Sequence, residues 1–266
     1  MEVTNIMATP RVLILRAPGT NCDQESAFAF EQAGAQADLV HVNRLLEHNQ
    51  LVADYQILCL PGGFSYGDDV AAGRILGNQL KQHLHATVNE FKAAGKLILG
   101  ICNGFQILLK SGVLLPDHPN TGAPATLTWN DSGKFEDRWV QLQVTSGKCV
   151  MLQGIESMYL PVAHAEGKFV TRDDEVLQAL EAAGQLPLRY TAASTNGAAT
   201  VPFPANPNGS VANVAGICDD TGRVLGLMPH PERFVDVTHH PRWTREQRTE
   251  KPDGCLIFEN TVSFFA

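Results

Sequence analysis

The sequence predicts an α/β protein with a doubly wound, mostly parallel sheet and an antiparallel β extension. Continuous apolar segments of strand length alternate with helical segments, and this order is typical of a parallel sheet covered by helices on both faces. Gly34, Gly95 and Gly112 end the helical segments. The alternating segments are RVLILRA (11–17), QESAFAFEQAG (24–34), ADLVHVN (37–43), YQILCLPGG (55–63), ILGNQLKQHLHATVNEFKAAG (75–95), KLILGI (96–101) and NGFQILLKSG (103–112).

The pattern changes after about residue 124. Residues 124–170 read as strands and turns, with KFEDRWVQLQV (134–144) the clearest strand. Next come a short helix, a Gly-, Pro- and Asn-rich loop, a hairpin and a closing helix. Their ranges are 173–184, 194–210, 211–229 with its turn at Asp220–Gly222, and 255–265. Without a repeat or a linker, we expect one domain over 11–266 and a loose tail over 1–10.

Composition narrows the classes of function. The chain has 266 residues, 44% of them hydrophobic, and a net charge of −8, which argues against a nucleic-acid binder. No apolar run approaches the ~20 residues of a membrane helix, and the N-terminus lacks the pattern of a signal peptide. The six cysteines form no CxxC pair, which is typical of reduced thiols. We therefore expect a cytoplasmic protein that does not bind membranes.

Ligands of open parallel sheets bind at the C-terminal ends of the strands, and Cys102 lies at such an end. The segment LILGICNGFQILL (97–109) runs from a buried strand into a helix with Cys102 at the junction. Gly100 and Gly104 flank it at two-residue spacing, the pattern of a nucleophile elbow. A helix N-terminus also favours the thiolate. The alternative is a buried structural cysteine at a strand end.

A second candidate, His230, follows another apolar strand in LGLMPHPERF (225–234). The prolines on both sides restrict its backbone, and Glu232 is close enough to orient the imidazole. Cysteine, histidine and carboxylate together form a general nucleophilic arrangement. The alternative is a surface histidine in a loop.

The segment LPGGFSYGDD (60–69) ends a third strand with two glycines. Gly62 and Gly63 let the backbone approach a ligand closely, and the N–H of Asn103 is a natural second donor to an oxyanion. A plain turn is the alternative. Asp68 and Asp69 lack an evident third ligand, so we expect loop hydrogen bonds there and no metal.

His164 is a weaker candidate, in PVAHAEGKF (161–169), because Glu166 and Gly167 follow it. A histidine that makes hydrogen bonds at the end of a strand explains this segment slightly better than a substrate contact does.

Taken together, PGG, GxCxGxQ and HPE resemble the class I (triad) glutamine amidotransferases in order and spacing. The resemblance implies a flavodoxin-like fold and a catalytic triad of Cys102, His230 and Glu232. It implies oxyanion donors at Gly63 and Asn103, beside Gly62, and a glutamine contact at Gln106. Further contacts to substrate or to another subunit are expected at Phe64, Ser65, His164 and Glu166.

Longer segments narrow the resemblance to the glutaminase subunits of phosphoribosylformylglycinamidine synthase, a carbon–nitrogen ligase of purine biosynthesis that uses glutamine as amido donor. They are APGTNCD, PGGFSYGDD, GICNGFQILLKSGVLLP, AHAEGKF, NPNGS and VAGICDDTGRVLGLMPHPER. AHAEG stands where the family has HGEG, and the segment 235–254 is longer than in compact relatives.

This resemblance implies that glutamine is hydrolysed to glutamate and ammonia through a thioester on Cys102. The ammonia would pass to an ATP-binding synthetase subunit, and a small accessory subunit would join the complex. The chain has no GxxxxGK[ST] motif, so we expect no cofactor in it and place ATP and Mg²⁺ on the partner. The alternatives are a free-standing cysteine hydrolase or glutaminase of the same fold, and a catalytically silent subunit.

Overall fold

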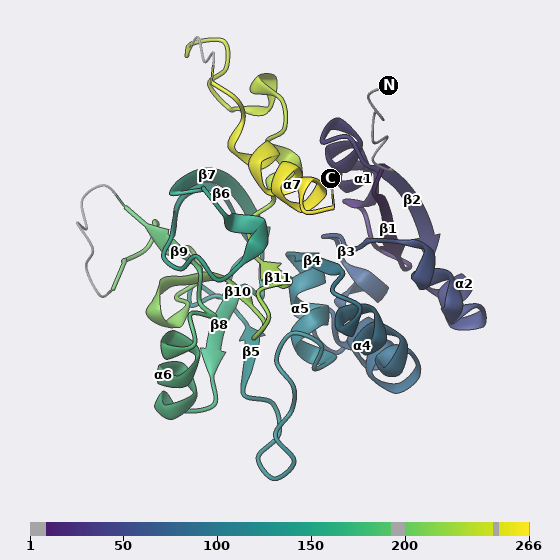
Figure 1. Ribbon diagram of the computed structural model, residues 1–266. Coiled ribbons are helices and arrows are strands. Elements are labelled where there is room, and N and C mark those ends of the chain that lie inside the picture. Colours follow the sequence, from purple (N-terminus) through teal and green to yellow (C-terminus); the bar gives the residue numbers. More distant parts are fainter. Residues whose placement is uncertain (1–8, 193–199, 247–249, 266) are drawn as a thin grey trace, which may run out of the picture.

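The computed structural model describes residues 9–192, 200–246 and 250–265. Within these ranges the strands form a nine-stranded sheet in the order β2-β1-β3-β4-β11-β10-β9-β6-β7, and β5 pairs with β8 in a separate ribbon (Figure 1). The strands are β1 (Arg11–Arg16), β2 (Gln36–His41), β3 (Ile57–Leu60), β4 (Leu97–Ile101), β5 (Ala125–Thr128), β6 (Glu136–Val144), β7 (Ser157–His164), β8 (Lys168–Thr171), β9 (Leu188–Thr191), β10 (Val214–Cys218) and β11 (Val224–Leu227).

The first half of the sheet is parallel, as the sequence predicts, and its strands are buried except for the partly exposed edge strand β2. Strands β2, β1, β3, β4 and β11 all pair in parallel. Helices cover both faces of the sheet. Figure 1 shows α1 and α7 together near the labelled chain ends, and α4 and α5 together at a distance from them. Phe30 of α1 meets Phe258 of α7 edge to face at 4.9 Å. The helices are α1 (Asp23–Gln32), α2 (Val42–Glu47), α3 (Arg74–Gln79), α4 (His85–Ala93), α5 (Asn103–Lys110), α6 (Asp174–Ala182) and α7 (Asp253–Ser263).

The antiparallel extension continues the same sheet. Strand β10 pairs antiparallel with both β11 and β9, and β6 pairs antiparallel with β9 and β7. The predicted hairpin is confirmed at β10–β11. Its turn is held by buried Asp219, which accepts hydrogen bonds from Val224 N and Thr221 and forms a 2.9 Å ion pair with Lys92.

The predicted helix over 75–95 is wrong in one detail. Between α3 and α4 the chain forms a π-helical turn at Leu80–Leu84, and Leu84 departs from helical geometry with φ −120°. Buried Leu80 and Leu84 keep this turn against the core, so packing decides a change of helical pitch that the apolar pattern does not show.

The described part of the long segment 235–254 packs against the β6–β7 edge through His240. Its ring is buried and lies 5.3 Å from Trp139, 5.8 Å from Tyr159 and 5.9 Å from Phe234.

Most of the tail predicted over 1–10, and part of the loop predicted over 194–210, fall outside the described residues. No helix in the described part of the chain is long and apolar enough to cross a bilayer.

Glycines allow β4 and α5 to approach each other at the elbow. A Cβ added to Gly104 would lie 1.8 Å from the Leu60 carbonyl oxygen, and one added to Gly100 would lie 2.5 Å from Leu108. The first contact involves backbone, which cannot move without displacing β3. The junction that carries Cys102 therefore requires glycine at 104.

Replacing Gly104 with alanine is expected to lower the free energy of unfolding by at least about 1–3 kcal/mol, the range for overpacking a core. Urea unfolding followed by circular dichroism measures this change. Gly147→Ala is the matched control, because a Cβ there meets nothing within 4 Å. Equal stability of the two variants would show that β3 yields to the added methyl group.

Candidate active site

Cys102 occupies a strained backbone conformation at the end of β4. Its φ of 50° and ψ of −103° lie in a region that residues with a Cβ seldom adopt. Its N–H donates to Leu227 O at 2.8 Å, and its thiol donates to Ala163 O at 3.7 Å. The sequence-predicted elbow is therefore present, with β11 and β7 fixing the position of the sulfur.

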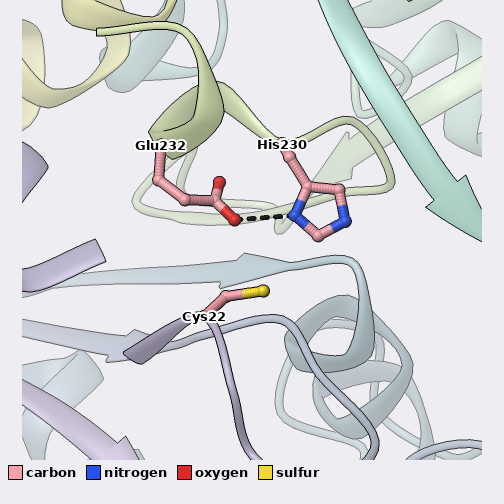
Figure 2. A group of neighbouring side chains, drawn as sticks. All are labelled: Cys22, His230 and Glu232. Carbon is pink, nitrogen blue, oxygen red and sulfur yellow. Dashed lines mark hydrogen bonds and ion pairs between the residues drawn. The ribbon is translucent and has the colours of Figure 1, made fainter. Parts of the chain in front are cut away.

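His230 and Glu232 form a buried pair beyond the end of β11 (Figure 2). The imidazole Nδ1 donates to Glu232 Oε1 at 2.6 Å, and His230 N donates to Pro161 O at 2.8 Å. The imidazole Nε2 has no hydrogen-bond partner among the described residues. Burial alone would lower the pKa of His230, but the Glu232 carboxylate and the Cys102 sulfur outweigh burial and raise the pKa well above its usual value. The ring is therefore built to carry a proton.

Gly62 and Cys22 fit closely around this pair. A Cβ on Gly62 would lie 2.8 Å from His230 Cε1 and 3.2 Å from Cys22 Sγ. Figure 2 shows the Cys22 thiol below the histidine ring, and metal-binding atoms of Cys22, His230 and Glu232 lie within 4.8 Å of one another. Arg233 donates to Cys22 Sγ at 3.2 Å, and its positive charge opposes a cation there.

Asn103 connects the elbow to the glycine-rich loop. Its side-chain oxygen accepts from Ser65 N at 3.2 Å, and its side-chain nitrogen donates to Asp68 at 3.1 Å and to Gln106 at 2.9 Å. Its backbone N–H opens α5, where the first N–H groups have no partner within the helix. Asn103 directly follows Cys102, and Gly63 lines the same two cavities as Cys102.

Cys102 lines two neighbouring cavities. The first, which we call the acid-lined cavity, has a volume of about 270 Å³ and contains Gly63, Phe64, Gly67, Asp68, Ala72, Cys102, Gln106, Trp129, Ala163, His164, Ala165 and Glu166. The second has a volume of about 190 Å³ and contains Asn21, Cys22, Gly63, Phe64, Cys102, Phe135, Asp137, Ala163, His230 and Arg233. The nucleophile candidate thus has space for a small substrate on one side and its base candidate on the other.

His164 is a buried hydrogen-bonding residue at the end of β7. Its ring contacts Asn130 Oδ1 at 3.1 Å and Asn208 Nδ2 at 3.5 Å. Burial, followed by the nearby charge of His230, lowers the pKa of His164 to about 3, so the ring is neutral at physiological pH. A Cβ on Gly167 would lie 2.3 Å from this ring, which explains the glycine of AHAEG.

The structure brings most of the sequence-predicted residues together at one edge of the sheet. Four of them, Gly62, Ser65, Asn103 and Glu232, are not among the residues that line the two cavities. Phe64 is half exposed at the mouth and lies 6.4 Å from Phe135. Four residues of the site were not predicted from the sequence: Cys22, Arg233, Asn130 and Trp129. Of these, only Cys22 could have been found from the sequence, because it lies just after the first strand.

Comparison with known proteins places the chain in a family. The sequence matches the CobB/CobQ-like glutamine amidotransferase domain over residues 9–265. A phosphoribosylformylglycinamidine synthase subunit PurQ from Dehalococcoides mccartyi is 47% identical, with 97% of this chain and 98% of that protein covered. A PurQ subunit from Archaeoglobus fulgidus is 42% identical over 96% of each chain.

A solved structure of PurLQS from Thermotoga maritima contains a chain with the same fold. It superimposes with a TM-score of 0.73 at 30% identity and covers 97% of this chain and 100% of that chain. A glutamine amidotransferase from the same organism, at 16% identity and a TM-score of 0.51, shares the fold alone. The chain therefore belongs to the CobB/CobQ-like glutamine amidotransferases, within the family of PurQ subunits of phosphoribosylformylglycinamidine synthase.

Proposed function

We propose that this chain is a glutaminase subunit, which hydrolyses glutamine and passes ammonia to an ATP-dependent synthetase subunit in purine biosynthesis. The observation that carries the proposal is the elbow at Cys102, beside the buried His230–Glu232 pair and open to a cavity sized for a small amino acid. Membership in the PurQ family supports the choice of glutamine as substrate.

In the first half of the reaction, the Cys102 thiolate attacks the carbon of the glutamine side-chain carboxamide. The N–H groups of Gly63 and Asn103 stabilise the oxyanion that forms. Protonated His230 gives its proton to the departing nitrogen, and ammonia leaves as a thioester forms on Cys102. The raised pKa of His230 suits this step, because the imidazolium and thiolate stabilise each other.

In the second half, the now neutral His230 takes a proton from water, and the resulting hydroxide attacks the thioester. The intermediate then breaks its bond to sulfur, which restores the Cys102 thiolate beside the His230 imidazolium. The product acid loses its proton to solvent and leaves as glutamate. Glu232 accepts a hydrogen bond from Nδ1 throughout, so that Nε2 is directed at the reacting atoms. Gln106 forms part of the cavity wall and contacts the substrate.

The proposed partner is a synthetase subunit of the PurL type, joined by a small accessory subunit. The PurLQS structure from Thermotoga maritima supports this assembly. We place ATP and Mg²⁺ on the partner, since the sequence has no nucleotide-binding glycine motif of its own. The cytoplasm remains the expected compartment, which fits six cysteines that are all described and free of disulfides.

Cys102→Ala is expected to abolish glutamine-dependent synthesis by the reconstituted complex, by about 10³-fold or more, because the nucleophile is removed. Ammonia-dependent synthesis should be about unchanged, since ammonia enters after the glutaminase step. Steady-state assays with each nitrogen source measure both rates. Cys255→Ala, remote from both cavities, is the control. Equal loss with the two nitrogen sources would contradict the proposal, and full glutaminase turnover by the chain alone would favour a free-standing enzyme.

Glu232→Gln is expected to lower the glutaminase rate by about 10³–10⁴-fold, as for the third member of other triads. The pKa of His230 should fall, because burial then acts without the opposing carboxylate. Nitrogen-15 NMR of the labelled imidazole at varied pH follows this change. Glu25→Gln is the matched control, since Glu25 pairs with Arg233 at the surface and does not contact His230. An unchanged titration would show that Glu232 is not what holds the proton on the ring.

A further inference from the structure

Three side chains that can bind a metal ion converge at the site, and the proposed mechanism uses only two of them. The sulfur of Cys22, a ring nitrogen of His230 and a carboxylate oxygen of Glu232 all lie within 4.8 Å of one another (Figure 2). Each of the three residues is at most 2% exposed. A thiol, an imidazole and a carboxylate at this spacing form a ligand set for a divalent metal ion.

The mixture of ligand atoms selects the kind of metal. Sulfur and imidazole nitrogen suit Zn²⁺ and similar transition metals, whereas Mg²⁺ and Ca²⁺ prefer oxygen ligands. Bond lengths to Zn²⁺ of about 2.0–2.3 Å place neighbouring tetrahedral ligands roughly 3.3–3.6 Å apart. His230 Nδ1 and Glu232 Oε1 lie 2.6 Å apart, so they need to separate by less than about 1 Å to hold this ion between them.

The carboxylate has an atom available for the metal ion, and the thiol is fixed in place. Glu232 Oε2 is buried without a hydrogen-bond partner in the described part of the chain, and such an atom is a candidate contact for an ion. The backbone of Cys22 is held on both sides, because its N–H donates to Gly62 O at 3.2 Å and its carbonyl accepts from Ser26 N at 3.0 Å. The carboxylate can therefore adjust to a metal ion held by the sulfur.

Arg233 opposes a free cation at this place but is compatible with a metal ion that displaces protons. Its Nη2 donates to Cys22 Sγ at 3.2 Å, the outer contact that a metal-bound thiolate accepts. Burial raises the pKa of the Cys22 thiol, and His230 carries a proton, so Zn²⁺ displaces one proton from each. The two positive charges that arrive equal the two that leave, and the total charge beside Arg233 is unchanged.

A metal ion also has a path to these ligands. Cys22, His230 and Arg233 line the cavity of about 190 Å³ that contains Cys102. A cavity of this size admits a water molecule, which is a common fourth ligand of Zn²⁺. Metal binding at this place engages the ring nitrogen and the carboxylate that the proposed mechanism needs for its proton transfers.

We propose that Cys22, His230 and Glu232 form an inhibitory binding site for Zn²⁺ or a similar thiophilic divalent metal ion. The metal ion binds the pair that carries the proton and so stops the release of ammonia. Cys22 distinguishes this site from simple binding of a metal ion to the proposed triad. The inhibition rests on the proposed glutaminase function, whereas metal binding itself does not.

Cobalt(II) tests the ligand set, because a thiolate bound to Co²⁺ produces a charge-transfer band in the near ultraviolet. The full chain with Cys102→Ala is expected to bind Co²⁺ stoichiometrically and to show this band. Adding Cys22→Ser should remove the band and weaken binding by more than the ~10–100-fold that loss of an outer contact costs. Serine is a favoured residue at the start of a helix, so α1 should form as before.

Adding Cys255→Ser instead of Cys22→Ser is the matched control. Cys255 is a partly exposed free thiol that lines neither the acid-lined cavity nor its neighbour. The cobalt band should keep its intensity in this variant.

Inhibition is measured with the reconstituted complex at constant Mg²⁺. Zn²⁺ is expected to inhibit glutamine-dependent synthesis and to leave ammonia-dependent synthesis about unchanged. Cys22→Ser should raise the Zn²⁺ concentration needed for half inhibition about 10-fold or more, because one ligand is lost. Cys255→Ser should leave that concentration unchanged.

The outcomes separate this inference from the proposed function. A cobalt band that persists without Cys22, or equal inhibition of the wild type and Cys22→Ser by Zn²⁺, would overturn the metal site. Equal inhibition with both nitrogen sources would overturn its inhibitory role. Release of no ammonia from glutamine by the metal-free complex would overturn the glutaminase proposal and leave the cobalt result standing.

Discussion

The strained backbone at Cys102 is the constraint on which the rest of the site depends. A residue with a Cβ at φ 50° costs about 1–3 kcal/mol, so the surrounding structure must hold it in place. Close contact between Gly104 and the Leu60 carbonyl, and the hydrogen bond from Cys102 N to Leu227 O, supply this restraint. The Cys102 side chain consequently lines the cavities at the C-terminal edge of the sheet, where residues that follow the other strands also lie.

Burial around His230 strengthens the electrostatic interactions that determine its protonation state. Its ring and the Glu232 side chain are both almost fully removed from water, so their attraction is weakly screened. Gly62 leaves space for the ring, and the hydrogen bond from His230 N to Pro161 O fixes the backbone that carries it. A histidine that would lose its proton in such surroundings keeps it because a carboxylate and a sulfur are placed beside it.

The antiparallel extension completes the cavity that the parallel strands begin. Strand β7 supplies Ala163 O, which accepts from the Cys102 thiol, and ends in His164, which ties its neighbouring loops together through Asn130 and Asn208. The loop after it brings Glu166 against Gln106. The parallel half of the sheet thus holds the reacting groups, and the extension forms the wall that faces them.

The fold class of this protein and its main catalytic candidates could be predicted from the sequence itself. Continuous apolar strands, helix-ending glycines and the spacing of Gly100, Cys102 and Gly104 depend on local geometry, which a linear pattern records. The same holds for His230 and Glu232, two residues apart on a rigid Pro-flanked turn. The sequence therefore predicted the α/β class, the elbow and the residues of the proposed triad.

Other features were decided only by the tertiary structure. The position of Cys22 beside the imidazole and the neutral state of His164 depend on contacts between segments far apart in the chain. The π-helical turn at Leu80–Leu84 likewise follows from packing. Long-range packing and loss of water set these properties, and neither is visible in the spacing of residues along the chain.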